Sequence, residues 1–501
     1  MSTAQETGPK LVRELSSLDA SMIVVGSMIG SGIFITSAES ARLLGAPGLL
    51  LVAWALAGLL TVLGALCCSE LSAMMPRAGG QYVFLREAYG PVVGFLFGWS
   101  MFLVVQTGTI AAVSIAFAKF LGVFTDKVSA DLYLLGPVRF GSTGYAISLS
   151  TQQLVALGVI VVLTLINLRG LRTGKLIQNT LTATKTAALA ALIVVGLTVG
   201  YTKGSAAFTS SWFHPSLNGW TADGKGIPAA LGGIALVMLM GKAMIGPLFS
   251  QTAWNNVTFT GGEVRDPGKS LPRALILGCS VVVGLYLLAN VAYIVSLPLA
   301  DIQHAPQDRV GTLAMERALG TWGRYAMAGA ILVSTFGCVN GLVLAGARVY
   351  YAMARDGLFF RGVGTTNRNH VPAVALVAQG AWAALLTLPR TVTTSATGVV
   401  EYGNVYNQLL EFIVSADMAF YALMVGAVLV MRRKAPTADR PYRTPFFPVP
   451  ALLYLLLALL LIVDLLVLAP GTSGAGFGIV LTGLPVYLIW RRSGRRVAEA
   501  R

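Results

Sequence analysis

Charged residues are scarce in this chain. Asp, Glu, Lys and Arg make up 11% of its 501 residues, whereas soluble globular domains contain about 25%. Hydrophobic residues account for 55% and gather in long blocks. This composition excludes an ordinary soluble protein. The unit of organisation is instead the apolar stretch of about 20 residues that crosses a bilayer as one helix.

Residues that bind metals or carry out catalysis are also few. The four cysteines lie in apolar blocks without metal-ligand spacing, which is typical of small buried hydrophobes, and the three histidines fall in loops. No paired carboxylates or nucleophile–base pair stand out at membrane depth, and no complete phosphate-binding loop motif occurs. The sequence therefore predicts no catalytic residue, metal, cofactor or ATP drive. A membrane-embedded enzyme is kept as an alternative of another class.

What the chain does contain is a series of apolar blocks. Twelve can be counted: residues 19–43, 48–72, 91–121, 151–169, 174–199, 229–258, 274–297, 322–353, 372–388, 404–430, 449–469 and 475–491. The blocks are continuous and rich in Leu, Ala and Val, whereas barrel strands would be about ten residues long with alternating polarity. The sequence predicts an all-α integral membrane protein with 12 transmembrane helices.

The basic residues predict the orientation. Residues 1–18 are polar and lack the features of a signal peptide. Lys and Arg are more than twice as frequent in this tail, in the tail 492–501 and in the loops after even-numbered blocks as in the remaining loops. Positive residues are retained in the cytoplasm, so we expect a multi-pass protein of the cell (inner) membrane with both termini cytoplasmic. The net charge of +15 then reflects topology and not nucleic acid binding.

The first block is interrupted by glycine. Gly26, Gly30 and Gly32 fall within seven residues, and each glycine weakens a helix by about 1 kcal/mol relative to alanine. Gly26 and Gly30 also fit a small-xxx-small packing pair. A second glycine directly after Ser31 favours a break. The free amides at the start of the following half-helix would attract an anion such as a carboxylate.

The sixth block contains the second interruption. Pro247 removes a backbone donor and disturbs the preceding turn, and a run of polar residues over 250–256 follows at membrane depth. Helices one and six take the same place in two five-helix halves, residues 19–199 and 229–430, with two further helices over 449–491. Repeats that each contain an odd number of membrane helices lie in opposite orientations. Paired broken helices in such inverted halves indicate a substrate site at the midplane of a secondary transporter.

Five motifs in order resemble the amino acid–polyamine–organocation superfamily, and most closely the L-type amino acid transporters and their bacterial relatives. They are residues 29–34 (IGSGIF), 69–71 with 76–82 (SEL, PRAGGQY), 262–267 with 271–272 (GEVRDP, LP), 339–341 with 354–357 (VNG, ARDG), and 440–443 (RPYR). The resemblance covers about residues 15–470. It implies the LeuT-type fold, a 5+5 inverted repeat plus two helices, and alternating access.

The resemblance also implies a substrate site. Amides of the broken first helix would meet the substrate carboxylate, carbonyls of both breaks would meet its amino group, and Phe249 would be a thin outer gate. The residues implied at the site are Met28, Gly30, Ser31, Gly32, Phe249, Ser250, Thr252 and Asn255. The polar sequence of the sixth-helix break, and Asn256 where a tyrosine is frequent, depart from the family pattern.

Lys185 is a charge within the fifth block. It lies about 15 Å along its helix from Lys175, too deep to reach the membrane surface easily, and intramembrane charge is functional by default. It matches the lysine that replaces a sodium ion in sodium-independent family members. On this resemblance Lys185 would bridge the backbone near Gly26 to Ser334 or Thr335. A fixed tether and a proton carrier remain open as its roles.

Lys242 is a second charge within a predicted span. It precedes Phe249 by seven residues, about 10 Å toward the predicted outside. We hypothesise that it pairs with Glu411 or Asp417 of the tenth block as part of the outer gate. A charge that merely faces a water-filled vestibule is the alternative.

These patterns predict a sodium-independent permease or exchanger of neutral L-amino acids, because the expected site consists mainly of backbone groups. The alternative is a proton-coupled carrier of cationic amino acids or polyamines, for which Glu411 and Asp417 are the acidic candidates. The expected partners are the amino acid, the lipid bilayer and, as a candidate coupling ion, the proton. L-type relatives bond to a heavy subunit through a cysteine after helix 3. Residues 121–150 contain no cysteine, so no disulfide-linked heavy subunit is expected.

Overall fold

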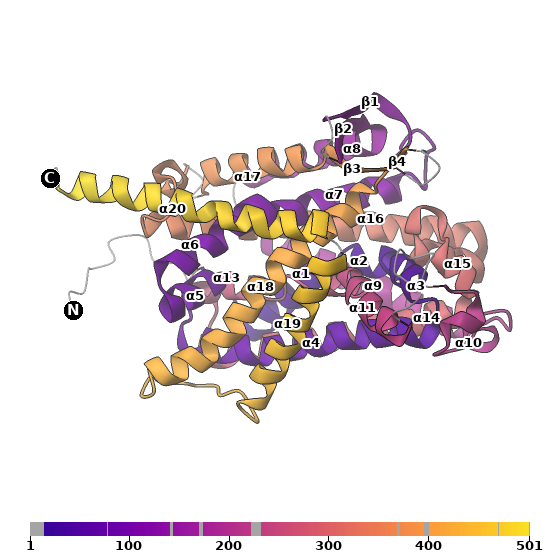
Figure 1. Ribbon diagram of the computed structural model, residues 1–501, viewed down its shortest axis with the longest axis horizontal. Helices are drawn as coiled ribbons and strands as arrows, with labels where there is room; N and C mark the ends of the chain where they lie inside the picture. Colours follow the sequence, from indigo (N-terminus) through magenta and orange to yellow (C-terminus); the bar gives the residue numbers. More distant parts are fainter. Residues whose placement is uncertain are drawn as a thin grey trace.

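The chain forms a bundle of helices that carries a small sheet at one end, as a computed structural model shows (Figure 1). The structure describes residues 15–77, 79–140, 144–169, 174–221, 232–367, 371–394, 400–468 and 470–499. We call the end with the strands the sheet end, and the opposite end, where α20 ends at Glu499, the tail end. The predicted tail residues 1–14, 500 and 501 lie outside the described residues.

The helices vary widely in length. The longer ones are α1 (Ser17–Met28), α4 (Pro47–Met74), α7 (Gln106–Leu121), α8 (Thr151–Leu168), α9 (Gly174–Thr198), α14 (Pro267–Ser296), α16 (Val310–Arg355), α18 (Val405–Lys434), α19 (Val449–Leu468) and α20 (Ala475–Glu499). The shorter ones are α2 (Gly32–Ile35), α3 (Ser37–Leu44), α5 (Gln81–Tyr89), α6 (Pro91–Ser100), α10 (Ala206–Thr209), α11 (Gly232–Ala243), α12 (Ile245–Ser250), α13 (Asn256–Phe259), α15 (Leu299–Gln303) and α17 (Ala373–Leu386).

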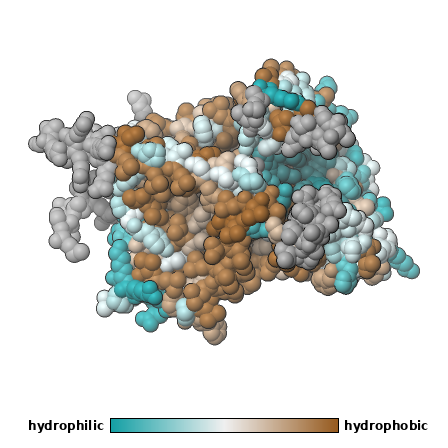
Figure 2. All heavy atoms as spheres, in the orientation of Figure 1, coloured by the Kyte–Doolittle hydropathy of each residue, from teal (hydrophilic) through white to brown (hydrophobic). Residues whose placement is uncertain are grey.

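The apolar helices coincide with the predicted blocks. Among the described residues, nine helices are long and apolar enough to cross a membrane, and three shorter apolar helices cover 235–250, 373–386 and 475–490. Each falls within or over one of the predicted blocks. Figure 2 shows hydrophobic side chains over the middle of the bundle and hydrophilic ones toward its two ends, as a bilayer requires. The chain is thus a multi-pass membrane protein.

The first helix is broken where the glycines predicted. α1 ends at Met28, Ile29 has an extended backbone, and α2 begins at Gly32. Thr36 keeps helical dihedral angles between α2 and α3, so the two form one half-helix over residues 32–44. Other helices pack around this unit: α12 and α16 lie against α2, and α4, α11 and α15 lie against α3.

The sixth helix unwinds later than Pro247 alone would predict. Pro247 lies within α12, and the irregular segment is residues 251–255, between α12 and α13. Ala253 takes a left-handed φ of 66° there, which is costly for a residue with a side chain. The polar run 250–256 therefore marks the break better than the proline does.

A small sheet accompanies the helices at one end of the bundle. The strands β1 (Tyr133–Arg139), β2 (Tyr145–Ser150), β3 (Pro389–Thr394) and β4 (Val400–Tyr402) pair antiparallel in the order β1-β2-β3-β4. β2 alternates half-buried and buried side chains, the period of a strand with one covered face. The sheet joins two loops that are far apart in sequence, which a count of apolar blocks does not reveal.

Near the tail end, a buried carboxylate fastens α4 to α18. Glu70 is 1% exposed. It accepts hydrogen bonds from Arg432 Nε at 2.9 Å and Arg432 Nη2 at 2.7 Å, and from the Thr444 amide at 2.8 Å. Arg440 Nε lies 3.5 Å away. One carboxylate thus holds the end of α4, the end of α18 and the link into α19.

We expect Glu70→Gln to lower the thermal stability of the purified protein. The amide keeps the shape but leaves Arg432 and Arg440 without their carboxylate, a loss of about 3 kcal/mol for a buried pair. Glu87→Gln is the matched control, because the Glu87 carboxylate is 42% exposed in its pair with Arg86 and such pairs contribute less than about 1 kcal/mol. The unfolding midpoint in detergent measures both. Equal midpoints would show that the cluster is not structural.

Candidate functional site

The two helix breaks touch in the middle of the bundle. Gly32, the first residue of α2, lies against α12 so closely that a Cβ there would overlap Ser250 Oγ. Ser250 Oγ donates to the Gly246 carbonyl at 2.7 Å and lies 3.4 Å from Thr36 Oγ1. Only glycine permits this approach, so the second glycine of the first-helix signature serves the contact between the half-helices.

Two tyrosines of α14 fix the first break from both sides. Tyr286 donates from its hydroxyl to the Met28 carbonyl at 2.8 Å, and Tyr293 donates to the Ile33 carbonyl at 3.1 Å. Both side chains are fully buried. The Met28 carbonyl, expected to meet a substrate amino group, therefore already holds one hydrogen bond and has its second lone pair to offer.

The start of α2 has no side-chain cap. Ser31 precedes α2 but its side chain caps none of the α2 amides, and the first amides of a helix have no intrahelical partner. Gly30 has room beside it, since a Cβ there would lie 3.4 Å from Cys338 Sγ. Free amides at a half-helix start can accept a carboxylate, so the arrangement suits an amino acid's acidic group.

An aromatic pair lies beside these amides. Phe249 packs edge-on against Tyr406 of α18, with ring centroids 6.1 Å apart at 84°. Tyr406 Oη lies 3.2 Å from Ser31 Oγ. Sequence reasoning proposed Phe249 and missed Tyr406, because a single tyrosine at the start of an apolar block does not differ from a core residue. Thr252 is turned inward: its hydroxyl donates to the Phe249 carbonyl at 2.8 Å.

Asn255 belongs to a buried polar network. Its Nδ2 donates to Gln81 Oε1 at 2.6 Å, and its Oδ1 accepts from the Tyr421 hydroxyl at 3.1 Å. Gln81 in turn donates to the Phe420 carbonyl at 3.1 Å. The network ties the sixth-helix break to α5 and α18. Gln81 lies in one of the recognised motifs, yet its partner could not be read from the sequence.

Lys185 reaches the first helix. Its ammonium donates to the Gly26 carbonyl, and the side chain is 1% exposed. The two α16 hydroxyls are placed differently from expectation. Within the described part of the chain, Ser334 Oγ is buried without a hydrogen-bond partner, and Thr335 Oγ1 donates to the Ile331 carbonyl at 2.8 Å. The tether in this structure thus runs from α9 to α1.

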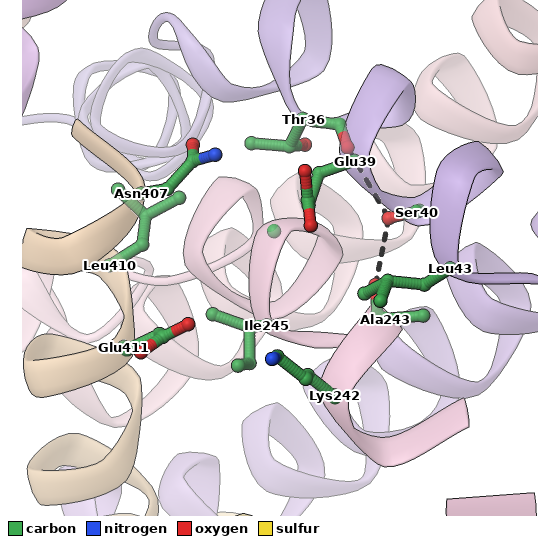
Figure 3. A pocket seen from close by; sticks show the side chains of 11 residues that line it. Thr36, Glu39, Ser40, Leu43, Lys242, Ala243, Ile245, Asn407, Leu410 and Glu411 are labelled. Atoms are coloured by element: carbon green, nitrogen blue, oxygen red, sulfur yellow. Dashed lines mark hydrogen bonds between the residues drawn. The ribbon is translucent and has the colours of Figure 1, made fainter. Parts of the chain in front are cut away.

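A pocket opens between α3, the junction of α11 and α12, and α18 (Figure 3). Lys242 and Glu411 both line it, and in Figure 3 the Ile245 side chain lies between their charged ends. Glu39 lines the opposite side. Of the two carboxylates expected near Lys242, the pocket contains Glu411 only. Asp417 is buried six residues further along α18, which places it about 9 Å nearer the tail end.

The fold and the site together define the class of protein. Two broken membrane helices meet in the interior of the bundle. An uncapped helix start lies beside an aromatic pair, and a pocket lies toward one end of the bundle. Half-helix ends that offer amides and carbonyls at membrane depth are the sites of secondary transporters.

The chain belongs to the amino acid permease family. The family's sequence profile, described as "Amino acid permease", matches residues 15–489, nearly the whole chain. Members of this family are transporters and not enzymes.

Named relatives are similar over most of their length. The large neutral amino acids transporter small subunit 2 of Homo sapiens is 30% identical, over 96% of this chain and 81% of that protein. The Asc-type amino acid transporter 1 of Mus musculus is 28% identical, over 96% and 82%. The b(0,+)-type amino acid transporter 1 of Homo sapiens is 26% identical, over 91% and 83%. The chain is therefore an amino acid permease or exchanger.

The contact between the breaks yields a paired prediction. Gly32→Ala places a methyl group on Ser250 and should abolish amino acid uptake, because the two half-helices can no longer approach. Gly30→Ala adds the same group where the nearest side-chain atom is 3.4 Å away, and should keep at least about half of the uptake. Uptake into proteoliposomes, normalised to monodisperse protein, measures both. Equal activities would contradict the contact.

Proposed function

We propose that this permease carries neutral L-amino acids across the cell membrane by alternating access, without sodium, as an exchanger or uniporter. The observation that carries the proposal is the Lys185 ammonium bound to the Gly26 carbonyl. A fixed positive charge at the first-helix break supplies the electrostatic attraction that a bound cation would otherwise supply there. The site then needs no sodium ion to hold α1.

The proposed substrate contacts follow from the breaks. The carboxylate binds the amides around Gly30, Ser31 and Gly32, and the amino group binds the carbonyls around Met28, Phe249, Ser250 and Thr252. Asn255, held by Gln81 and Tyr421, borders the space for the side chain. None of these eight residues carries an ionised side chain, which supports a neutral substrate. Several relatives are named large neutral amino acids transporters, which supports the same proposal.

A carrier of cationic amino acids is the second candidate. Glu39 and Glu411 line the pocket toward the sheet end, and carboxylates there would concentrate cations near the entrance. Uptake measured with both neutral and cationic amino acids distinguishes this candidate from the neutral carrier.

Orientation, repeats and partners complete the proposal. The basic residues support cytoplasmic termini, so the sheet end faces outward, and the two broken helices support inverted repeats over residues 19–199 and 229–430 with two added helices over 449–491. Some relatives are named as small subunits. Residues 121–150 contain no cysteine, so we propose that this chain has no disulfide-linked heavy subunit.

The decisive experiment is uptake into proteoliposomes with a panel of labelled neutral and cationic amino acids and polyamines. We vary sodium, the pH gradient and internal substrate. Saturable, sodium-independent uptake of a neutral amino acid is expected. Dependence on internal substrate identifies exchange, and dependence on the pH gradient identifies proton coupling. Uptake restricted to cationic compounds would replace the proposal with its alternative.

Lys185→Met should reduce that uptake at least about tenfold, because the Gly26 carbonyl and α1 lose their cationic partner. Lys203→Met is the matched control, since Lys203 lies exposed in the loop after α9 and should leave uptake unchanged. Sodium-dependent uptake by the unmodified protein would refute the role given to Lys185.

Lys242→Met tests whether the pocket residue takes part in gating. If Lys242 pairs with Glu411 as the outer gate closes, the variant should lower the maximal exchange rate by several-fold and leave half-saturation nearly unchanged. Unaltered transport would mean that Lys242 only faces the water-filled vestibule.

A further inference from the structure

Lys119, near the sheet end of α7, is a buried charge that the proposed function does not use. Its side chain is 4% exposed. Within the described residues its ammonium is buried and has no hydrogen-bond partner. It lies 3.7 Å from Asp308 Oδ2 and 5.6 Å from the centre of the Tyr406 ring. A buried ammonium held only by one distant carboxylate and a ring face is costly, so its position calls for an explanation.

Asp308 is shared between two helices. It closes a short 3-10 turn (Pro306–Asp308) in the link between α15 and α16, with a left-handed φ of 61°. Its Oδ1 accepts from Arg42 Nη1 of α3 at 2.8 Å, while Oδ2 faces Lys119 of α7. The same Arg42 nitrogen donates to the Gln303 carbonyl at 2.6 Å. One carboxylate therefore joins α3, α7 and the α15–α16 link.

A second contact also fastens the α15–α16 link to α7. Arg309 Nη1 donates to the Lys119 carbonyl at 2.9 Å. Arg42 is also paired with Glu39, whereas Asp308 is the carboxylate that lies against both Arg42 and Lys119. Without Asp308 these two cations would lose their shared carboxylate, and like charges disfavour a common site. Lifting the link would hydrate all three charges. Desolvation opposes the closed cluster while Coulomb attraction favours it.

Tyr406 connects this cluster to the substrate site. The Lys119 ammonium lies over one face of the Tyr406 ring, and Phe249 packs edge-on with the same ring. The Tyr406 hydroxyl lies 3.2 Å from Ser31 Oγ, just before α2. α2 and α3 form one half-helix, so a carboxylate bound at its start acts on the same rigid unit that carries Arg42 at its other end. The site and the cluster thus share both α2–α3 and Tyr406.

We propose that Arg42, Asp308 and Lys119 form an outer latch, and that Tyr406 is the positioning residue through which an occupied site closes it. Substrate at the start of α2 orders Ser31 and Tyr406, Tyr406 holds Lys119 toward Asp308, and Asp308 draws Arg42 and the α15–α16 link over the entrance. The inference rests on the proposed function for the identity of the substrate and for the outward direction of the sheet end.

The test measures how accessible the entrance is. Asn407 lines the pocket of Figure 3, so Asn407→Cys supplies a reporter thiol whose reaction with a hydrophilic maleimide is followed in nanodiscs. The described native cysteines are buried, and the chain without the reporter gives the background. Labelling rates are measured in the presence and in the absence of a saturating concentration of the transported amino acid. The reporter chain is compared with reporter chains that also contain Lys119→Met, Asp308→Asn or both substitutions.

Without substrate, Lys119→Met and Asp308→Asn should each raise the labelling rate by about tenfold, and the double variant should be no faster than either single one, as for partners in one interaction. Lys119→Arg should restore most of the slow rate. The exposed residues give matched controls: Lys127→Met and Asp126→Asn should label like the unmodified reporter. Equal substrate-free rates in all variants would overturn the latch.

With substrate, the unmodified reporter should label several-fold more slowly, and Tyr406→Phe should lose most of this protection while keeping the substrate-free rate. Full protection in Tyr406→Phe would overturn its positioning role. Failure of the proposed function gives a different signature: no neutral amino acid protects the unmodified reporter, while the substrate-free rates still decide on the latch. Gel filtration of each variant confirms that the labelled protein is folded.

Discussion

The backbone at the two helix breaks is the constraint on which the rest of this structure depends. A helix that unwinds at membrane depth frees N–H and C=O groups away from bulk water. Each such group left without a partner costs several kcal/mol. The described structure meets this cost at α1 with side chains from other helices. Tyr286 and Tyr293 donate to carbonyls on either side of the break, and Lys185 donates to a third.

These donors are all placed on the carbonyl side, and this asymmetry suits the proposed chemistry. The Gly26 and Met28 carbonyls before the break and the Ile33 carbonyl after it are bound by protein groups, whereas the α2 start has no side-chain cap. The protein therefore holds α1 in place by itself and leaves the amides of α2 for the substrate carboxylate. A carboxylate is the one group common to all amino acids, so binding it through the backbone leaves selectivity to the residues around the side chain.

The sequence alone predicts the parts of the site that depend on local chemistry. Gly30 and Gly32 indicate the first break because glycine weakens a helix wherever it occurs, and Lys185 is conspicuous because a charge in an apolar block is rare. Tyr406, Gln81 and Tyr286 are not predictable in this way. Each belongs to a residue type that is common in apolar helices, and its role arises only from which distant helix it faces.

The same distinction applies to the sheet and to the pocket. The alternation in β2 is visible in the sequence, but its partner β3 lies more than two hundred residues away, and pairing over such a distance is decided by the helices between them. Glu411 and Asp417 look equivalent as two carboxylates on one helix. Six residues of helical rise and rotation place them in different surroundings, so that Glu411 faces the pocket and Asp417 is buried deeper in the bundle.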